Sequence, residues 1–260
     1  EELLGQALEG RRERLVLGTK GCSPVGEGVN DRGASRYHLM NALEASLRRL
    51  RTDHVDLYQV HQYDPTTPLD ELMRTLDDMV RSGKVRYAGA SNFLSWQICR
   101  GNDLAAQRGG EPFITTQGHY NLLERDVERE LIPFCRASGV GLLAYFALAN
   151  GLLAGRYAPD APPPPDSRAA VFERTQRYLN RYATTGNYAV IARLTEWAQA
   201  RGHTMPELAI AWVLAEPAVS TALTGASSVA QVVANARAAD WALTPDEAEA
   251  LRALAAGQPG

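Results

Sequence analysis

Short apolar runs alternate with amphipathic helical segments along the whole chain. The runs are RLVLGTK (14–20), HVDLYQVH (54–61), VRYAGAS (85–91), FITTQ (113–117), VGLLAY (140–145) and VSTALTG (219–225). Between them, apolar residues recur at helical spacing, as in Leu39, Leu43, Leu47 and Leu50. Apolar strands separated by helices are typical of a parallel sheet that helices cover. The sequence therefore predicts an α/β fold built from repeated strand–helix units.

Polar or small residues stand at the carboxyl ends of these expected strands. They are Lys20, His61, Ser91, Asn92, Gln117, Tyr145 and Gly225. An open doubly wound sheet would need a glycine-rich phosphate turn, but the segment 21–33 has neither GxGxxG before a helix nor the lysine of a P-loop. A closed barrel would bring all these strand ends to one rim, where barrel enzymes place their sites. The pattern favours a (β/α)₈ TIM barrel.

Such a barrel has eight strands, and six are found in the sequence. The chain opens without Met in a helix-like segment, EELLGQALEG. We therefore expect the first two strands to be absent from this chain, and residues 1–260 to form one N-terminally incomplete barrel domain. The Pro-rich segment 155–168 is expected to be a surface loop on the functional rim, since its prolines cannot continue a helix or a central strand.

Composition narrows the classes of function. A formal charge of −3 and a pI near 6.0 argue against a nucleic-acid-binding surface. The three cysteines lie far apart without a CxxC, so we expect no disulfide framework and no metal site, and a reducing cytoplasm fits best. Apolar runs are too short to span a membrane. A homo-oligomer is left open.

Six segments give the chain a resemblance to a known family. They are LGTKG, SLRRLRTDHVDLYQVHQYD, GKVRYAGASNF, TTQGHYNLL, GVGLLAYFALANGLLAGRY and GASSVAQVVANARA. In this order and at these strand ends, they resemble the aldo-keto reductases, which are NADPH-dependent (β/α)₈ barrel enzymes. The details are most similar to the branch with the voltage-gated potassium-channel β subunits and many bacterial reductases.

The resemblance implies a catalytic tetrad of Asp, Tyr, Lys and His. Lys20 and His61 match its lysine and histidine, whereas the Asp and Tyr align before Glu1. In the family, hydride passes from nicotinamide to a carbonyl carbon while the tyrosine protonates the oxygen. A nearby ammonium lowers the pKa of a phenol, and an imidazole N–H can orient the carbonyl. We expect these roles for Lys20 and His61.

The resemblance also implies an NADP site. Ser91, Asn92 and Gln117 would hold the carboxamide, and Tyr145 would stack on the nicotinamide ring. The pyrophosphate loop would include Phe146, Ala147, Leu148, Gly151 and Arg156, and the adenosine end would contact Gly225, Ser227, Gln231 and Asn235. Two departures stand out: Phe146-Ala147 replaces the family's Ser-Pro, and no Arg or Lys lies near Ser227. Arg168 matches a loop arginine that contacts the 2′-phosphate, which favours NADP over NAD.

Each of these residues also has an ordinary structural explanation. A strand-end histidine is often a core residue, and Ser91-Asn92 is a plausible helix N-cap pair. The leading function is an NADP-dependent reductase of an aldehyde or ketone. The alternative is a non-catalytic NADP-binding regulatory subunit that resembles potassium-channel β subunits, and a third is a barrel lyase with Lys20 as Schiff base. The sequence does not name the small-molecule carbonyl substrate.

Overall fold

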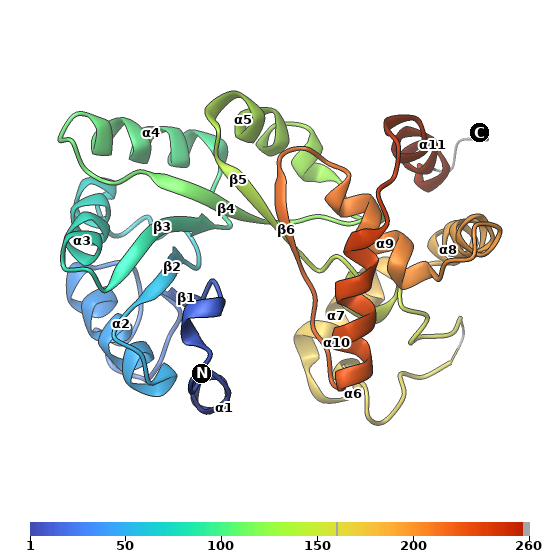
Figure 1. Ribbon diagram of the computed structural model, residues 1–260, viewed down its shortest axis with the longest axis horizontal. Coiled ribbons are helices and arrows are strands. Elements are labelled where there is room, and N and C mark those ends of the chain that lie inside the picture. Colours follow the sequence, from blue (N-terminus) through green and yellow to red (C-terminus); the bar gives the residue numbers. More distant parts are fainter. Residues whose placement is uncertain (160, 257–260) are drawn as a thin grey trace. The chain divides into compact units, whose positions relative to one another are not determined.

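The computed structural model describes residues 1–159 and 161–256. Parallel strands alternate with helices along these residues, which confirms the α/β class (Figure 1). The chain divides into two compact units, which are described separately below. Unit 1 comprises Glu1–Gln117 and Ala137–Gly141, and unit 2 comprises Gly118–Arg136 and Leu142–Gly260.

Unit 1 is a parallel sheet in which each strand pairs with the next one in the chain. Its strands are β1 (Gly18–Gly21), β2 (Val55–Val60), β3 (Val85–Ser91) and β4 (Phe113–His119), whose last two residues belong to unit 2. Helices α2 (Arg36–Leu50), α3 (Leu69–Arg81) and α4 (Ser95–Ala106) follow the first three of these strands and lie along the outside of the sheet in Figure 1. A short helix, α1 (Glu2–Ala7), and a 3₁₀ turn, η1 (Arg12–Arg14), precede β1.

The core of unit 1 lies between its strands and these helices. Leu39 and Leu43 of α2 and Leu76 of α3 are fully buried, and each such side chain contributes about 1.5–3 kcal/mol through the hydrophobic effect. Tyr58 of β2 is also on this side, because its hydroxyl donates to the carbonyl oxygen of Leu39 over 3.4 Å. Since side chains alternate along a strand, Leu57 and Gln59 lie on the other face of the sheet.

The first strand begins later than the sequence pattern predicts. Residues 14–17 do not continue β1, and Leu15 and Val16 are exposed. Arg12 explains the difference, since its guanidinium donates to the carbonyl oxygens of Leu15 and His54 and pairs with Asp56. The guanidinium thereby holds residues 12–15 in a turn, and the pairing with β2 starts only at Gly18.

Unit 2 contains the parallel pair β5 (Gly141–Tyr145) and β6 (Val219–Leu223), with Gly141 itself assigned to unit 1. The helical elements are η2 (Asp126–Glu128), α5 (Leu131–Ser138), η3 (Ala149–Gly151), α6 (Arg168–Val171), α7 (Glu173–Tyr182), α8 (Thr185–Gln199), α9 (Met205–Leu214), α10 (Val229–Arg237), η4 (Ala238–Asp240) and α11 (Pro245–Ala255). Helix α9 is buried along most of its length, and the indole of Trp212 donates to Ala248 of α11 over 3.1 Å.

Two helical patterns of the sequence differ from the structure of unit 2. Val127 lies in η2, outside the helix that carries Leu131 and Phe134. Val229, Val232 and Val233 of α10 are exposed, and none of the residues of α10, all of which the structure describes, is buried. Apolar residues at helical spacing thus mark the helix here without marking a buried face.

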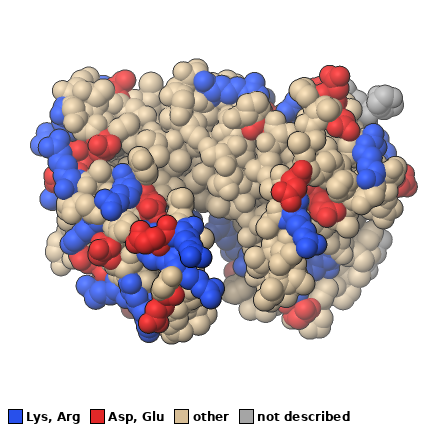
Figure 2. Space-filling view, in the orientation of Figure 1, with Lys and Arg blue, Asp and Glu red and all other residues tan. Residues whose placement is uncertain are grey.

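The Pro-rich segment 155–168 has no helix or strand among its described residues before Arg168. It ends where Ser167 caps α6, with its hydroxyl accepting from the backbone N–H of Ala170 over 3.4 Å. Within residues 1–159 and 161–256, none of the helices is long and apolar enough to cross a membrane. On the face drawn in Figure 2, lysine and arginine side chains lie among aspartate and glutamate side chains.

Candidate functional site

In unit 1, the predicted catalytic residues lie on one face of the sheet at the carboxyl ends of neighbouring strands. Lys20 of β1 pairs in register with Gln59 of β2. Val60 pairs with Ala90, so His61 follows at the level of Ser91, and Ser91 pairs with Gln117. Because side chains alternate along each strand, Lys20, Gln59, His61, Ser91 and Gln117 share the face opposite the helices.

Close contacts around two glycines support this assignment of faces. A Cβ at Gly21 would clash with the ring of Tyr58, so Gly21 faces the helices and Lys20 faces away from them. A Cβ at Gly89 would lie 2.4 Å from the hydroxyl of Thr115 and 3.1 Å from Gln59 Cγ. Gln59, Gly89 and Thr115 therefore share the face of Lys20, where the absence of a side chain at Gly89 leaves room for both neighbours.

Lys20 has an exposed side chain, and its pKa nevertheless differs from the ordinary value of a lysine. Protein atoms around its ammonium group displace water, and this desolvation lowers the pKa of Lys20 from its ordinary value. A desolvated ammonium interacts more strongly with a neighbouring dipole or anion than a hydrated one does. This is the property that a lysine needs in order to stabilise an anion beside it.

Three hydrogen bonds fix the position of His61. Its backbone N–H donates to the carbonyl oxygen of Gly21 over 3.0 Å, and its own carbonyl oxygen accepts from the amide of Asn92 over 3.0 Å. Its ring Nδ1 lies 2.7 Å from the hydroxyl of Ser23. The residue is also half-buried. The three bonds hold both its backbone and its ring at the end of β2.

Asn92 ties the ends of the strands together. It adopts a left-handed backbone conformation with φ of 56°, which asparagine tolerates better than most residues. Its backbone N–H donates to Gln117 over 3.1 Å, and its side-chain amide donates to the hydroxyl of Ser91 over 3.1 Å as well as to His61. Helix α4 begins at Ser95 with Leu94 as its N-cap, so the N-cap interpretation of Ser91-Asn92 is wrong.

Ser91 and Gln117 are both buried, and Gln117 contacts a residue that sequence reasoning missed. The amide of Gln117 donates to Gln59 Oε1 over 3.4 Å, and Gln59 donates to the carbonyl oxygen of Ala90 over 3.5 Å. Gln59 is a polar residue inside an otherwise apolar strand, in register with Lys20. That position was the signal that could have identified it.

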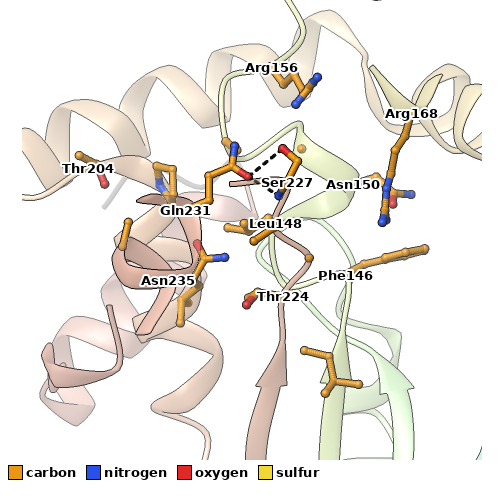
Figure 3. A pocket seen from close by; sticks show the side chains of 18 of the residues that line it. Phe146, Leu148, Asn150, Arg156, Arg168, Thr204, Thr224, Ser227, Gln231 and Asn235 are labelled. Carbon is orange, nitrogen blue, oxygen red and sulfur yellow. Dashed lines mark hydrogen bonds between the residues drawn. The ribbon is translucent and has the colours of Figure 1, made fainter. Parts of the chain in front are cut away.

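In unit 2, nine predicted cofactor-binding residues line one cavity of about 660 Å³ (Figure 3). They are Phe146, Leu148, Gly151, Arg156, Arg168, Gly225, Ser227, Gln231 and Asn235. Asp166, Thr204 and Glu207 also line the cavity. Its volume lies in the range of about 300–1,000 Å³ that is usual for ligand sites.

The loop after β5 has an unusual backbone that shapes one wall of this cavity. Phe146, Ala149 and Asn150 all have positive φ angles of 48–58°, and Gly151 has φ of 102°. The side-chain amide of Asn121 supports the first of these residues by donating to the carbonyl oxygen of Phe146 over 2.9 Å. Ala147 is fully buried and is not among the residues that line the cavity.

The two arginines of the cavity have different environments. Arg156 pairs with Asp166 over 2.9 Å, which neutralises part of its charge. Arg168 lies beside Gly225 at the end of β6, with its guanidinium nitrogens 3.8 Å from where a Cβ at Gly225 would be. Figure 3 shows the side chains of Arg168 and Phe146 on the same side of the cavity, across from Gln231. Together the arginines make the cavity suitable for an anion.

Across the cavity, the start of α10 presents amide and hydroxyl groups. Gln231 Oε1 accepts from both the backbone N–H and the hydroxyl of Ser227, over 2.8 and 3.1 Å (Figure 3). Ser228 caps the helix by accepting from the backbone N–H of Gln231 over 3.3 Å. Asn235 lies one turn further along the same helix and also lines the cavity.

Tyr145 is not among the residues that line this cavity, and its ring belongs to a cluster of rings that the sequence did not reveal. Its ring stacks on His119 with centroids 5.2 Å apart, and Phe146, Tyr178 and Tyr182 also pack around His119. Burial raises the pKa of Tyr145 and lowers the pKa of His119. The cluster anchors α7, which carries Tyr178 and Tyr182, to the ends of β4 and β5.

Among the described residues, no group of three or more His, Cys, Asp or Glu side chains could hold a metal ion. The residues present instead fit an anionic nucleotide: a cavity of suitable size, two arginines on its wall and amide and hydroxyl groups opposite them.

Comparison with known proteins identifies the family. The Aldo/keto reductase family model matches residues 1–256. The uncharacterized oxidoreductase YrpG of Bacillus subtilis is 36% identical over 94% of this chain and 72% of its own length. Versiconal hemiacetal acetate reductase of Aspergillus parasiticus is 35% identical over 84% of this chain and 68% of its own length.

A relative with a different assigned role is equally similar. The probable voltage-gated potassium channel subunit beta of Oryza sativa subsp. japonica is 35% identical over 100% of this chain and 80% of its own length. The alternating parallel strands and helices of the chain agree with the (β/α)₈ barrel expected for these proteins. On this evidence, the chain belongs to the aldo/keto reductase family.

Proposed function

We propose that this protein transfers a hydride from NADPH to the carbonyl carbon of an aldehyde or ketone. Family membership supports an oxidoreductase that acts on carbonyl groups. The observation that carries the proposal is the position of Lys20 and His61 on one face, at the carboxyl ends of adjacent parallel strands. A cation and an imidazole at such a place are suited to act on a carbonyl group that is being reduced.

Lys20 would act on the acid that protonates the carbonyl oxygen. A phenol has a pKa near 10 and is a poor acid at neutral pH. A desolvated ammonium beside it favours the phenolate and so lowers its pKa. The environment of Lys20, in which desolvation already lowers the pKa of the amine, supports this role.

His61 would orient the carbonyl by donating from its ring to the carbonyl oxygen. Its backbone hydrogen bonds to Gly21 and Asn92 fix the Cα of His61, which supports a fixed direction for the donor. Ser91 and Gln117 are buried on the same face and would bind an amide group there, since their hydroxyl and amide are paired donors and acceptors. When bound, the reduced nicotinamide ring supplies the hydride.

The cavity of unit 2 would bind the phosphate and adenosine portions of the nucleotide. Arg156 and the strained loop 146–151 would contact the pyrophosphate, where Gly151 allows a close approach of the backbone. Arg168 would contact the 2′-phosphate and thereby favour NADPH over NADH. Ser227, Gln231 and Asn235 would contact the adenosine.

A second function, binding of NADP without turnover in a regulatory subunit, has one observation in its favour. A relative that covers the whole of this chain is named as a probable potassium channel β subunit. Both functions use the same cavity for the nucleotide. They differ in whether the cluster around Lys20 and His61 turns over a substrate.

Stopped-flow oxidation of NADPH by the intact protein, with a panel of aldehydes and ketones, tests the proposal. We expect turnover with at least one carbonyl compound and its loss in the Lys20→Met variant. NADPH binding without turnover of any carbonyl would contradict the reductase and support the regulatory subunit. Absence of NADPH binding would contradict both functions.

A further inference from the structure

We propose that Ser23 is a positioning residue, whose hydroxyl holds the ring of His61 in the tautomer with its proton on Nε2. This inference rests on the proposed function, because the value of that tautomer depends on a carbonyl group to which His61 donates. Ser23 lies in the loop that follows β1, and no family motif above assigned it a role. By fixing the tautomer, Ser23 would make Nε2 of His61 a hydrogen-bond donor.

The contact is short and specific. Ser23 Oγ lies 2.7 Å from His61 Nδ1, a normal length for a hydroxyl hydrogen bond. Ser23 is half-buried, and so is His61. The two residues are thirty-eight positions apart in the sequence, so the tertiary structure and not local geometry brings them together.

The loop that carries Ser23 is fixed on both sides of this contact. Cys22 is buried with a φ of 87°, a conformation rare for a residue with a side chain. Its thiol donates to the carbonyl oxygen of Gln62 over 3.5 Å, and its carbonyl oxygen accepts from Gly33 over 2.9 Å. The backbone N–H of Ala34 donates to Asp64 over 2.8 Å. These bonds tie the loop to the chain after β2.

A serine hydroxyl can either donate or accept, so the 2.7 Å contact fits both tautomers, and the proposal assigns Ser23 as the donor. A neutral imidazole has one ring nitrogen that donates and one that accepts. When the Ser23 hydroxyl donates to Nδ1, Nδ1 must be the acceptor and Nε2 must carry the proton. Only then does the ring present an N–H toward a carbonyl oxygen on the side away from Ser23. In the other tautomer, Nε2 would repel the carbonyl oxygen.

The tautomer matters when the ring of His61 is neutral. A neutral imidazole can donate from only one nitrogen, so its tautomer decides whether it acts as donor or acceptor. A hydroxyl at Nδ1 therefore has a direct effect on the function proposed for His61.

The test combines ¹⁵N NMR of histidine-labelled intact protein with steady-state kinetics. The chain has five histidines, and the His61→Gln variant assigns the His61 signals. We expect the wild-type protein to show the Nε2–H tautomer at His61. In Ser23→Ala we expect a mixture of tautomers and a fall in kcat of about tenfold, the value of one neutral hydrogen bond, with an unchanged KM for NADPH.

Two further variants separate positioning from folding. Ser23→Thr keeps the hydroxyl and should restore both the tautomer and kcat. Ser82→Ala removes a hydroxyl that donates to Met79 over 2.8 Å in α3, and it should change neither. A loss of kcat in Ser23→Ala that Ser23→Thr does not restore would overturn the positioning role.

The spectroscopic and kinetic results also distinguish this inference from the proposed function. An Nδ1–H tautomer in the wild-type protein, or the same tautomer in wild type and Ser23→Ala, would overturn the inference even if the protein reduces carbonyls. A tautomer shift without a change in kcat would overturn the role of Ser23 in catalysis. If no carbonyl is reduced, the proposed function fails, and the catalytic role of Ser23 fails with it, whatever tautomer the spectra show.

Discussion

The backbone N–H of His61 donates to the carbonyl oxygen of Gly21, the residue after Lys20, over 3.0 Å. This bond joins the ends of β1 and β2 at the same level. Because Gly21 faces the helices, Lys20 and His61 both project from the other face of the sheet. The ammonium and the imidazole therefore belong to one end of unit 1, and desolvation there lowers the pKa of Lys20.

This environment predicts that Lys20 costs the folded protein stability at neutral pH. Desolvation by neighbouring protein atoms lowers the pKa of Lys20 below its ordinary value of 10.5, so the charged form is less stable in the folded than in the unfolded state. Lys20→Met should therefore raise the free energy of unfolding at pH 7. The gain should shrink as the pH rises through the interval between the lowered pKa and about 10.4.

Urea denaturation of both proteins from pH 7 to pH 10 measures this dependence. Lys84→Met, at the other lysine of the chain, is the matched control. Lys84 pairs with Glu44, so its removal should not stabilise the protein. If Lys20→Met is less stable than wild type at pH 7, desolvation of the ammonium does not lower the free energy of unfolding, and the prediction is wrong.

Arg168→Ala should reduce the affinity for NADPH more than the affinity for NADH. Arg168 lies beside Gly225 at the wall of the cavity, and a charged contact to the 2′-phosphate is worth about 1.5–3 kcal/mol, or more than tenfold in Kd. Fluorescence titration with both nucleotides measures the ratio. Arg177→Ala, which removes an exposed arginine paired with Glu173 in α7, is the control. Equal losses for NADPH and NADH would place Arg168 away from the 2′-phosphate.

Asp64→Asn should destabilise the protein by about 1–3 kcal/mol at pH 7, the cost of weakening a charged hydrogen-bond acceptor. Burial alone would raise the pKa of Asp64, but hydrogen bonds from Thr66, Ala34 and Thr67 lower it to about 2. Because the folded-state pKa is depressed, this stabilisation is present above about pH 4 and is lost as the pH falls toward 2.

Chemical denaturation of wild type and Asp64→Asn at pH 7 and at pH 3 checks the effect. The difference in free energy between the two proteins should be smaller at pH 3. Asp103→Asn, at an exposed position of α4, should have little effect at either pH. A difference that grows at low pH would mean that the Asp64 carboxylate is not stabilised by its hydrogen bonds.

Tyr178→Ala should loosen α7 without unfolding unit 2. The ring of Tyr178 packs on His119, Phe146 and Tyr182, with centroids 5.5, 5.5 and 4.4 Å away. Tyr178 is half-buried, so its loss should cost less than the about 3–5 kcal/mol of a fully buried aromatic side chain, but it removes the ring contacts that hold this short helix. Hydrogen exchange should therefore speed up within residues 173–182. Phe172→Ala, at an exposed ring next to α7, should leave exchange there unchanged, and faster exchange in both variants would argue against the cluster as the anchor.

Sequence patterns predicted most of the fold because the burial of apolar residues determines where the strands and helices form. β3 begins at Val85 and ends at Ser91 as expected, and β2 differs from its expected range by one residue at each end. The sequence analysis also predicted that Lys20, His61, Ser91 and Gln117 lie together. It could do so because each stands at the carboxyl end of a strand, and parallel strands end at the same edge of a sheet. The predicted start of β1 was wrong, since the side chain of Arg12 holds residues 12–15 in a turn, so that part of the expected strand is not extended.

Other features depend on contacts that no local pattern contains. Ser23 meets His61 across thirty-eight residues, and the rings around His119 come from separate segments of the chain. Ala147 belongs to the expected pyrophosphate loop, but the positive φ of Phe146 turns it into the core. Spacing in a sequence does not encode these turns or these tertiary contacts.

The most direct test of the central claim is a single-turnover reduction of an aromatic aldehyde with NADPH deuterated at the transferring carbon. We expect deuterium at the carbinol carbon of the product with the intact wild-type protein. Lys20→Met should slow this transfer by about a hundredfold or more, the usual contribution of acid–base catalysis, with the Kd for NADPH nearly unchanged. Equal transfer rates in the two proteins, or a large loss of NADPH binding in the variant, would contradict the role of Lys20 and with it the proposed site.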